Sequence, residues 1–186
     1  MSEKEKNTWK TVKTEVKFET PWITVSRHDV ITPAGKPGLY GLVSFKNIAI
    51  GILPLDAEKN TWLVGQWRYP LGAYSWEIPE GGGPHGVDPL FSARRELKEE
   101  TGLLAGRWTE LSRMHTSNSV CDEYGILYLA QDLTQSEAEP EETEDLQIRK
   151  VPFEEAYQMV MKGEITDSLS MIAILKTRIL LDKGLV

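Results

Sequence analysis

The sequence has little cysteine and no long hydrophobic run. Cys121 is the single cysteine among 186 residues, so an intramolecular disulfide framework cannot form, and a reducing cytoplasm suits the chain. No apolar run reaches the roughly 18 residues that a membrane-spanning helix needs, so we expect no membrane partner. The opening "MSEKEKNTWK" is charged and lacks the apolar core of a secretory signal. These features lead us to expect a cytoplasmic protein.

Basic residues are also scarce. The chain has 21 Lys and Arg against 28 Asp and Glu, which gives a formal net charge of −7. Proteins that bind nucleic acid carry a basic patch or stripe, and none is found, so we expect no nucleic-acid partner. The acidity either serves solubility alone or includes carboxylates that bind metal, and composition leaves both interpretations open.

Turn residues divide the first half of the chain into short strands, and helical patterns close the second half. Residues 80–86 ("EGGGPHG") read as a glycine-rich loop. Strands are expected at 11–19, 22–31, 39–46, 47–55, 61–70, from residue 74 up to the glycine loop, 107–115, 123–131 and 146–151, and helices at 88–101, 153–162 and 168–183. This order of elements predicts an α/β sandwich.

The central helix carries three acids on one face. Glu96, Glu99 and Glu100 fall at i, i+3 and i+4, where like charges repel. A hard cation such as Mg²⁺ removes this repulsion, because it prefers carboxylate and phosphate oxygens. The alternative is a solvated helix face on which Arg95 pairs with Glu99. The preceding glycine-rich segment favours a site, since a backbone without side chains can approach a ligand closely.

Together these segments resemble the box motif of the Nudix hydrolases. Gly81 fits the first box position, and residues 95–103 ("RELKEETGL") fit the last nine. The resemblance implies an α/β/α sandwich with a mixed sheet. It also implies that Glu96, Glu99 and Glu100 gather Mg²⁺ or Mn²⁺ around a diphosphate that lies beside Gly81.

One box position departs from the family pattern. Val87 stands where the family has a glutamate that braces the box arginine, and Asp88 follows it. Asp88 therefore either takes over the bracing of Arg95 or serves as the helix N-cap, with Pro89 in the first helical position.

The resemblance extends beyond the box. Residues 63–82 ("LVGQWRYPLGAYSWEIPEGG") and 154–175 are similar to segments of enzymes that hydrolyse ADP-ribose and other nucleoside diphosphate sugars. It implies that the backbone carbonyl of Glu80 is a metal ligand and that Arg68 faces the diphosphate. The family's Ser-Pro-Gly turn is replaced by "SNS" at 117–119, which favours a broader range of nucleoside diphosphate sugars.

Two further residues are candidates for substrate binding by the same resemblance. Trp22 would stack on the base, although a strand tryptophan half buried in a core is the alternative. Glu123 would bind a ribose hydroxyl or support the metal, and its alternative is a surface acid. Residues 1–45 form an N-terminal strand region before a catalytic domain at 46–186. In related enzymes this region exchanges between subunits, so a homodimer is expected.

The general base is expected outside the box, because the box glutamates are committed to metal, with Glu100 serving more than one ion. In the related enzymes the base lies on a loop before the last strand, which here is the acidic segment 139–148. Its spacing from the following helix favours Glu142 as the base, with Glu144 as a metal or orienting partner. Glu144, Glu141 and Glu139 are the alternative bases.

The sequence thus predicts a metal-dependent diphosphatase for nucleoside diphosphate sugars such as ADP-ribose, ADP-sugars or GDP-sugars. Two alternatives are a nucleoside triphosphate pyrophosphohydrolase and a non-catalytic sensor of nucleotide sugars. The resemblance of residues 63–82 to nucleoside diphosphate sugar hydrolases argues against a triphosphate pyrophosphohydrolase. A sensor would be expected to have lost box glutamates, and all three are present.

Overall fold

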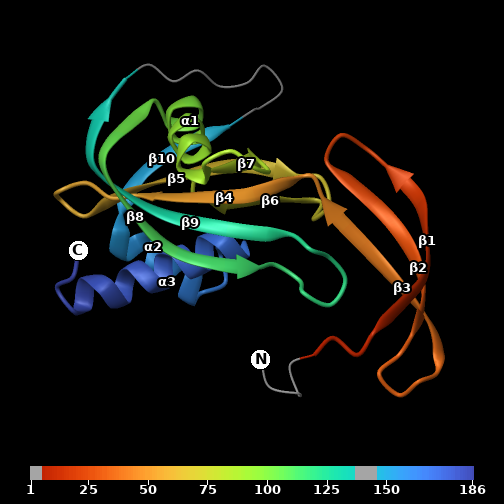
Figure 1. The fold of residues 1–186 in the computed structure, drawn as a ribbon. Coiled ribbons are helices and arrows are strands. Elements are labelled where there is room, and N and C mark those ends of the chain that lie inside the picture. Colours follow the sequence, from red (N-terminus) through yellow and green to blue (C-terminus); the bar gives the residue numbers. More distant parts are fainter. Residues whose placement is uncertain (1–5, 137–145) are drawn as a thin grey trace. The chain divides into compact units, whose positions relative to one another are not determined.

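The computed structural model describes residues 6–136 and 146–186. The chain forms two compact units, which are drawn as a ribbon in Figure 1. The first unit comprises Met1–Asn47 and His115–Glu123, and the second Ile48–Met114 and Tyr124–Val186. Within the described ranges, no helix is long and apolar enough to cross a membrane.

The first unit is a three-stranded antiparallel meander. Its strands are β1 (Lys10–Glu19), β2 (Ile23–Ile31) and β3 (Pro37–Phe45), in that order across the sheet. Segment 115–123 lies along β3, where the amide of Val43 donates to the carbonyl of Val120 at 3.0 Å. Of the residues described in this unit, only Ser26 and Val30 are buried. The meander confirms the three strands expected there.

The second unit contains two sheets and three helices. One sheet has the order β7-β4-β9-β8 and the other β10-β5-β6. The elements are β4 (Asn47–Pro54), β5 (Asn60–Arg68), β6 (Ala73–Glu77), β7 (Glu80–Pro84), α1 (Pro89–Thr101), β8 (Leu103–His115), β9 (Tyr124–Gln135), β10 (Gln147–Pro152), α2 (Phe153–Met161) and α3 (Ser168–Asp182).

Alternating side chains of the central strands β4 and β9 divide the core into two layers. Ile50 and Ile52 pack in the cluster that includes Leu97 of α1, whereas Leu53 packs in the cluster of α2 and α3. Successive residues of a strand point to opposite faces, so an apolar run buries both faces of β4. Figure 1 shows α1 and the α2–α3 pair on opposite sides of the sheets, which confirms the α/β sandwich.

Most of the glycine-rich segment is a strand, so the loop expected at 80–86 was wrong for residues 80–84, while residues 85 and 86 form a turn. Glu80–Pro84 forms β7 at the edge of the sheet beside β4. Glycine has little intrinsic preference for strands, but here tertiary packing requires it. A Cβ at Gly83 would lie 3.1 Å from the hydroxyl of Ser92 and 3.2 Å from Ile50, so missing side chains let α1 approach the sheet.

The limits of α1 follow its sequence signals. The carboxylate of Asp88 accepts a hydrogen bond from the amide of Leu90 at 3.0 Å, and Pro89 begins the helix. At the other end Gly102 adopts a φ of 68°, and its amide donates to the carbonyl of Lys98. Left-handed glycine is the common helix stop, so both ends are confirmed.

Candidate active site

Two of the three box glutamates lie buried against β7. The exposed fractions of Glu96 and Glu100 are 9% and 4%, while Glu99 is more accessible. An ideal Cβ on Gly81 would lie 2.2 Å from the carboxyl carbon of Glu96. The absence of a side chain at Gly81 therefore makes the space that the Glu96 carboxylate occupies.

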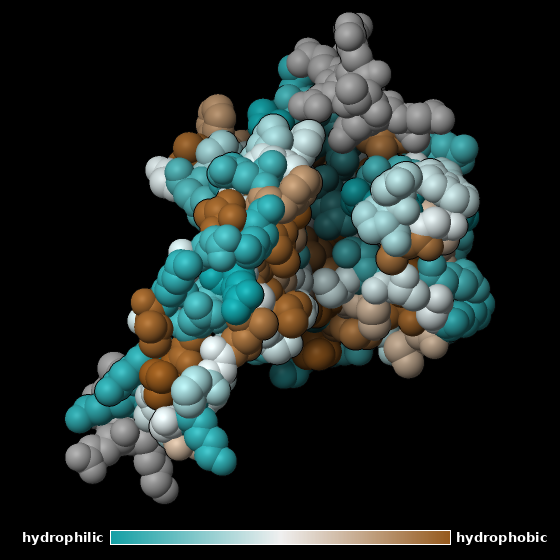
Figure 2. All heavy atoms as spheres, turned by 90° about the vertical axis from the view of Figure 1, so that its right-hand side faces the viewer, coloured by the Kyte–Doolittle hydropathy of each residue, from teal (hydrophilic) through white to brown (hydrophobic). Residues whose placement is uncertain are grey.

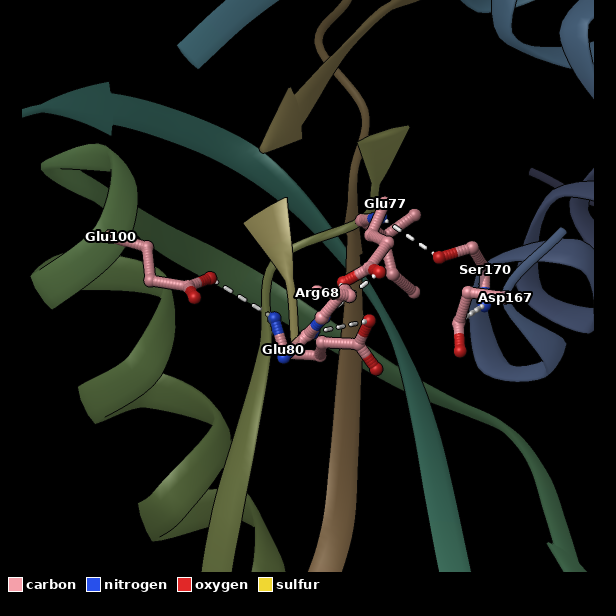
Figure 3. Close-up of polar contacts among 7 residues, drawn as sticks. Arg68, Glu77, Glu80, Glu100, Asp167 and Ser170 are labelled. Atoms are coloured by element: carbon pink, nitrogen blue, oxygen red, sulfur yellow. Dashed lines mark hydrogen bonds and ion pairs between the residues drawn. The ribbon is translucent and has the colours of Figure 1, made fainter. Parts of the chain in front are cut away.

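Glu100 connects α1 to the beginning of β7. Its Oε2 accepts a hydrogen bond from the amide of Glu80 at 3.0 Å (Figure 3). A charge-assisted bond of this kind fixes the backbone at Glu80. The structure thus places the expected carbonyl ligand on a segment held by an expected carboxylate ligand.

The box arginine is held by its own helix and by β7. Arg95 donates from Nη2 to Glu96 at 2.5 Å and to the carbonyl of Gly82 at 3.0 Å, and from Nη1 to Glu99 at 2.6 Å. Burial lowers the pKa of Arg95, but the charges of Glu96 and Glu99 outweigh it and the net pKa is raised. Asp88 caps the helix. Of the two roles considered for Asp88, the structure shows capping, and the Gly82 carbonyl is a further contact that holds Arg95.

The chemistry of this donor set fits Mg²⁺ or Mn²⁺. Glu96, Glu99 and Glu100 supply carboxylate oxygens and Glu80 a carbonyl oxygen, the ligands that hard cations prefer. In residues 6–136 and 146–186, no three His, Cys, Asp or Glu side chains are already gathered closely enough to hold an ion. Two of these carboxylates, Glu96 and Glu99, form ion pairs with Arg95.

A second cluster of charges surrounds Arg68 at the end of β5. Its Nε lies 3.0 Å from both carboxylate oxygens of Glu77, and its Nη2 also donates to Glu77. Burial raises the pKa of Glu77, but the hydrogen bond from Arg68 and further contacts outweigh it and lower the net pKa. Glu77 is therefore a buried carboxylate that its arginine partner keeps ionised.

The side chain of Glu80 completes this second cluster. Its Oε1 is 3.6 Å from Nη2 of Arg68 and has no hydrogen-bond partner among residues 6–136 and 146–186. Burial raises the pKa of Glu80 well above its ordinary value, and the negative charges of Asp167 and Glu77 add to the effect. Figure 3 shows Asp167 and Ser170 at the beginning of α3 beside Glu77 and Glu80. The hydroxyl of Ser170 accepts a hydrogen bond from the amide of Ile78 at 3.0 Å.

The sequence prediction missed Glu77 and Asp167. The alternation of β6 would have placed Glu77 on the same face as Ser75, which is also buried. No spacing relates Asp167 to Glu80, because they come from distant parts of the chain.

The remaining predicted residues lie elsewhere. Trp22 is 68% exposed in the first unit, so the alternative of a half-buried core tryptophan is not what the structure shows. Glu123, also in the first unit, accepts a hydrogen bond from the hydroxyl of Thr116 at 2.6 Å. Glu142 and Glu144 lie outside the described residues.

Comparison with known protein families identifies the family of the chain. Residues 45–169 match the family model described as the NUDIX domain. The chain belongs to the Nudix family. Residues 9–43 match the nucleoside diphosphate sugar hydrolase N-terminal domain, so both regions of this Nudix hydrolase match known domain models.

Similar proteins cover nearly the whole Nudix chain. An "ADP-ribose pyrophosphatase" of Bacillus subtilis (strain 168) is 32% identical over 167 residues, which are 89% of this chain and 90% of the relative. A "Methanol dehydrogenase activator" of Bacillus methanolicus has the same identity and coverage. A crystal structure titled "ADP compounds hydrolase" matches with a TM-score of 0.84 and 22% identity over 96% of this chain and 97% of that one, which shows the shared fold.

Proposed function

We propose that this Nudix hydrolase splits nucleoside diphosphate sugars, including ADP-ribose, into a nucleoside monophosphate and a sugar phosphate. The observation that carries the proposal is the packing of the buried Glu96 and Glu100 carboxylates against β7. Glu80, the first residue of β7, also has its side chain 3.6 Å from the guanidinium of Arg68. Carboxylates that can bind cations, beside a fixed arginine, suit a diphosphate. The matched N-terminal domain and the Bacillus subtilis relative support a nucleotide sugar as the diphosphate.

The metal-binding residues would be Glu96, Glu99, Glu100 and the carbonyl of Glu80. When bound, Mg²⁺ or Mn²⁺ would neutralise negative charge on the phosphates and lower the pKa of a bound water. This chemistry reconciles an acidic protein with an anionic substrate.

The protein's own groups would bind and orient the substrate and accept a proton from the attacking water. Arg68 would donate to a diphosphate oxygen, and the bare backbone at Gly81 leaves room for close approach. A carboxylate would accept the proton of the attacking water. We propose Glu142 for this step, with Glu144 as a metal or orienting partner. Glu123 would bind a ribose hydroxyl or support the metal.

A substrate panel tests the function. Purified protein with Mg²⁺ would be incubated with ADP-ribose, ADP-glucose, GDP-mannose and ATP, and the products separated by ion-exchange chromatography. We expect monophosphate and sugar phosphate from the nucleotide sugars. Faster release of pyrophosphate from ATP would favour a triphosphate pyrophosphohydrolase. Binding of nucleotide sugars by calorimetry without turnover would favour a sensor.

A further inference from the structure

The guanidinium of Arg68 is held along one edge. Nε and Nη2 form the edge that faces Glu77, at 3.0 Å from Nε to each carboxylate oxygen. Arginine carries five N–H donors in a rigid planar fork. Within the described part of the chain, Nη1 makes no hydrogen bond, and the side chain of Arg68 is 36% exposed. One edge is therefore occupied, and the Nη1 donors are not used by any described residue.

Glu77 is itself firmly placed. Its side chain is 4% exposed, and it ends β6, whose residue Ala73 pairs with Arg68 across the sheet. The next amide, that of Ile78, donates to the buried hydroxyl of Ser170 on α3. The carboxylate thus belongs to the rigid core of the second unit, and a side chain held by such a partner keeps one orientation.

Glu80 restricts Arg68 from another direction. Its Oε1 lies 3.6 Å from Nη2, the same nitrogen that donates to Glu77. The Glu77 carboxylate and the carboxyl group of Glu80 therefore both lie at the Nε–Nη2 edge, and among the described residues neither forms a hydrogen bond or ion pair with Nη1. These contacts within the protein orient the guanidinium.

We propose that Glu77 is the positioning residue of the site, which directs the Nη1 side of Arg68 toward the diphosphate of the substrate. The proposal rests on the proposed function in one respect, namely that Arg68 binds the diphosphate. A guanidinium ordered in advance loses less rotamer freedom on binding. Glu77 does not contact the substrate, so its effect passes through Arg68.

A double-mutant cycle separates positioning from a general structural role. Glu77→Gln, Arg68→Gln and the double variant would be compared with the wild type in KM and kcat for ADP-ribose at saturating Mg²⁺. We expect each single variant to raise KM about 10-fold, which corresponds to the loss of one good charged contact. The double variant should show no further increase, because Glu77 acts only through Arg68.

Two kinetic outcomes would overturn the proposal. One is an unchanged KM in Glu77→Gln. The other is an equal, multiplicative rise in KM when Glu77→Gln is added to Arg68→Gln. Glu154→Gln is the matched control, because Glu154 pairs with Arg178 between α2 and α3, and it should leave KM unchanged.

The variants must be shown to fold. Removing Arg68 alone leaves Glu77 as an unpaired buried charge, which is strongly destabilising. The double variant differs from Arg68→Gln only by the isosteric change Glu77→Gln, which removes the unpaired charge, so its Tm should exceed that of Arg68→Gln. A Tm of the double variant below that of both single variants would indicate that each side chain has a separate structural role, against the proposal.

A readout without turnover distinguishes this proposal from the proposed function. In ¹⁵N NMR spectra, the Nε–H of Arg68 should exchange slowly with water in the wild type and about 10-fold faster in Glu77→Gln, since its buried acceptor is weakened. Equal exchange rates would refute the positioning role. If the wild type cleaves no nucleotide sugar but the exchange difference is found, the proposed substrate is wrong while the orientation of Arg68 by Glu77 stands.

Discussion

At the scale of single residues, the site depends on one missing side chain and several buried charges. Gly81 leaves the space that Glu96 occupies, and Glu100 holds the amide of Glu80. Buried charges are tolerated only when they are paired or bind a cation. Arg68 satisfies this condition for Glu77, and Arg95 contributes to it for Glu96.

Replacement of Glu100 tests the metal-binding helix face. We expect Glu100→Gln to lower kcat at least about 100-fold, because the amide cannot replace an anionic ligand. The fold should remain, since the amide oxygen can still accept the hydrogen bond from Glu80. Steady-state kinetics and circular dichroism would measure both effects. Glu164→Gln, on an exposed turn, is the control, and full activity of Glu100→Gln with Mg²⁺ would refute the metal role.

Addition of a single methyl group tests the close approach at Gly81. A Cβ would lie 2.2 Å from the Glu96 carboxyl carbon, so Gly81→Ala should displace Glu96 and lower kcat at least about 10-fold. Overpacking of this kind costs about 1–3 kcal/mol of unfolding free energy, which urea denaturation would measure. Gly41→Ala, which has open space around its Cβ, is the control for the unfolding free energy and should leave it unchanged. Wild-type kcat in Gly81→Ala would show that the position of the Glu96 carboxylate does not matter for catalysis.

The identity of the general base is also decided at single residues. If Glu142 accepts the proton of the attacking water, Glu142→Gln should lower kcat about 100-fold or more at saturating Mg²⁺, and Glu144→Gln should have a smaller effect. Glu58→Gln serves as a control on the exposed β4–β5 turn. Wild-type kcat in both loop variants would exclude this segment as the source of the base.

At the scale of elements, the site is assembled by the packing of α1 on β7 and by the adjacent ends of β5 and β6. The helix begins and ends at residues with clear capping chemistry. Strand β7, by contrast, is a run of weak strand formers, which pairing with β4 and contact with α1 stabilise. Local preference therefore decided the helix, and tertiary contact decided the strand.

The turn between β4 and β5 gives a pH-dependent prediction. Burial raises the pKa of Asp56, but hydrogen bonds from Lys150 and Asn60 outweigh it, so the net pKa lies below the ordinary 3.8. A lowered carboxyl pKa stabilises the fold above the unfolded-state value, and this contribution is lost as the pH falls through the folded-state value.

We therefore expect Asp56→Asn to lower the unfolding free energy by about 1 kcal/mol at pH 7. The difference from the wild type should shrink as the pH falls below 3.8. Urea denaturation at several pH values measures it. Asp132→Asn, an exposed acid, is the control. A difference that persisted unchanged at the lowest pH would show that the charge of Asp56 is not responsible.

At the scale of the whole molecule, the described residues of the first unit form no core of their own. Its three strands bury only Ser26 and Val30 among the described residues, while Val12, Val16 and Phe18 of β1 are exposed. Figure 2 shows apolar groups interspersed with polar ones along this sheet. Exposed apolar strands of this kind commonly mark an interaction surface, which supports the proposal of a homodimer formed through residues 1–45.

Two measurements test the formation of the dimer and the stacking of Trp22 on the nucleobase. Light scattering of the wild type should give the mass of a dimer. If Trp22 stacks on the nucleobase, Trp22→Ala should raise KM for ADP-ribose about 10-fold with little change in kcat, since a stacked base contributes about 1–3 kcal/mol. Trp67→Ala, at an exposed tryptophan of the second unit, is the comparison. A monomer at assay concentrations, or an unchanged KM in Trp22→Ala, would contradict the corresponding part.

The sequence by itself determined the strands of alternating pattern, the limits of α1 and the helical spacing of Glu96, Glu99 and Glu100, because caps and periodicity act over a few residues. Only the tertiary structure decided that residues 80–84 form a strand and that Glu77 holds Arg68. It also decided that Asp167 lies near enough to Glu80 to raise its pKa. These features depend on which strand pairs with which and on where α3 begins. Local sequence preference does not specify these features, because the residues involved come close together only when the core packs.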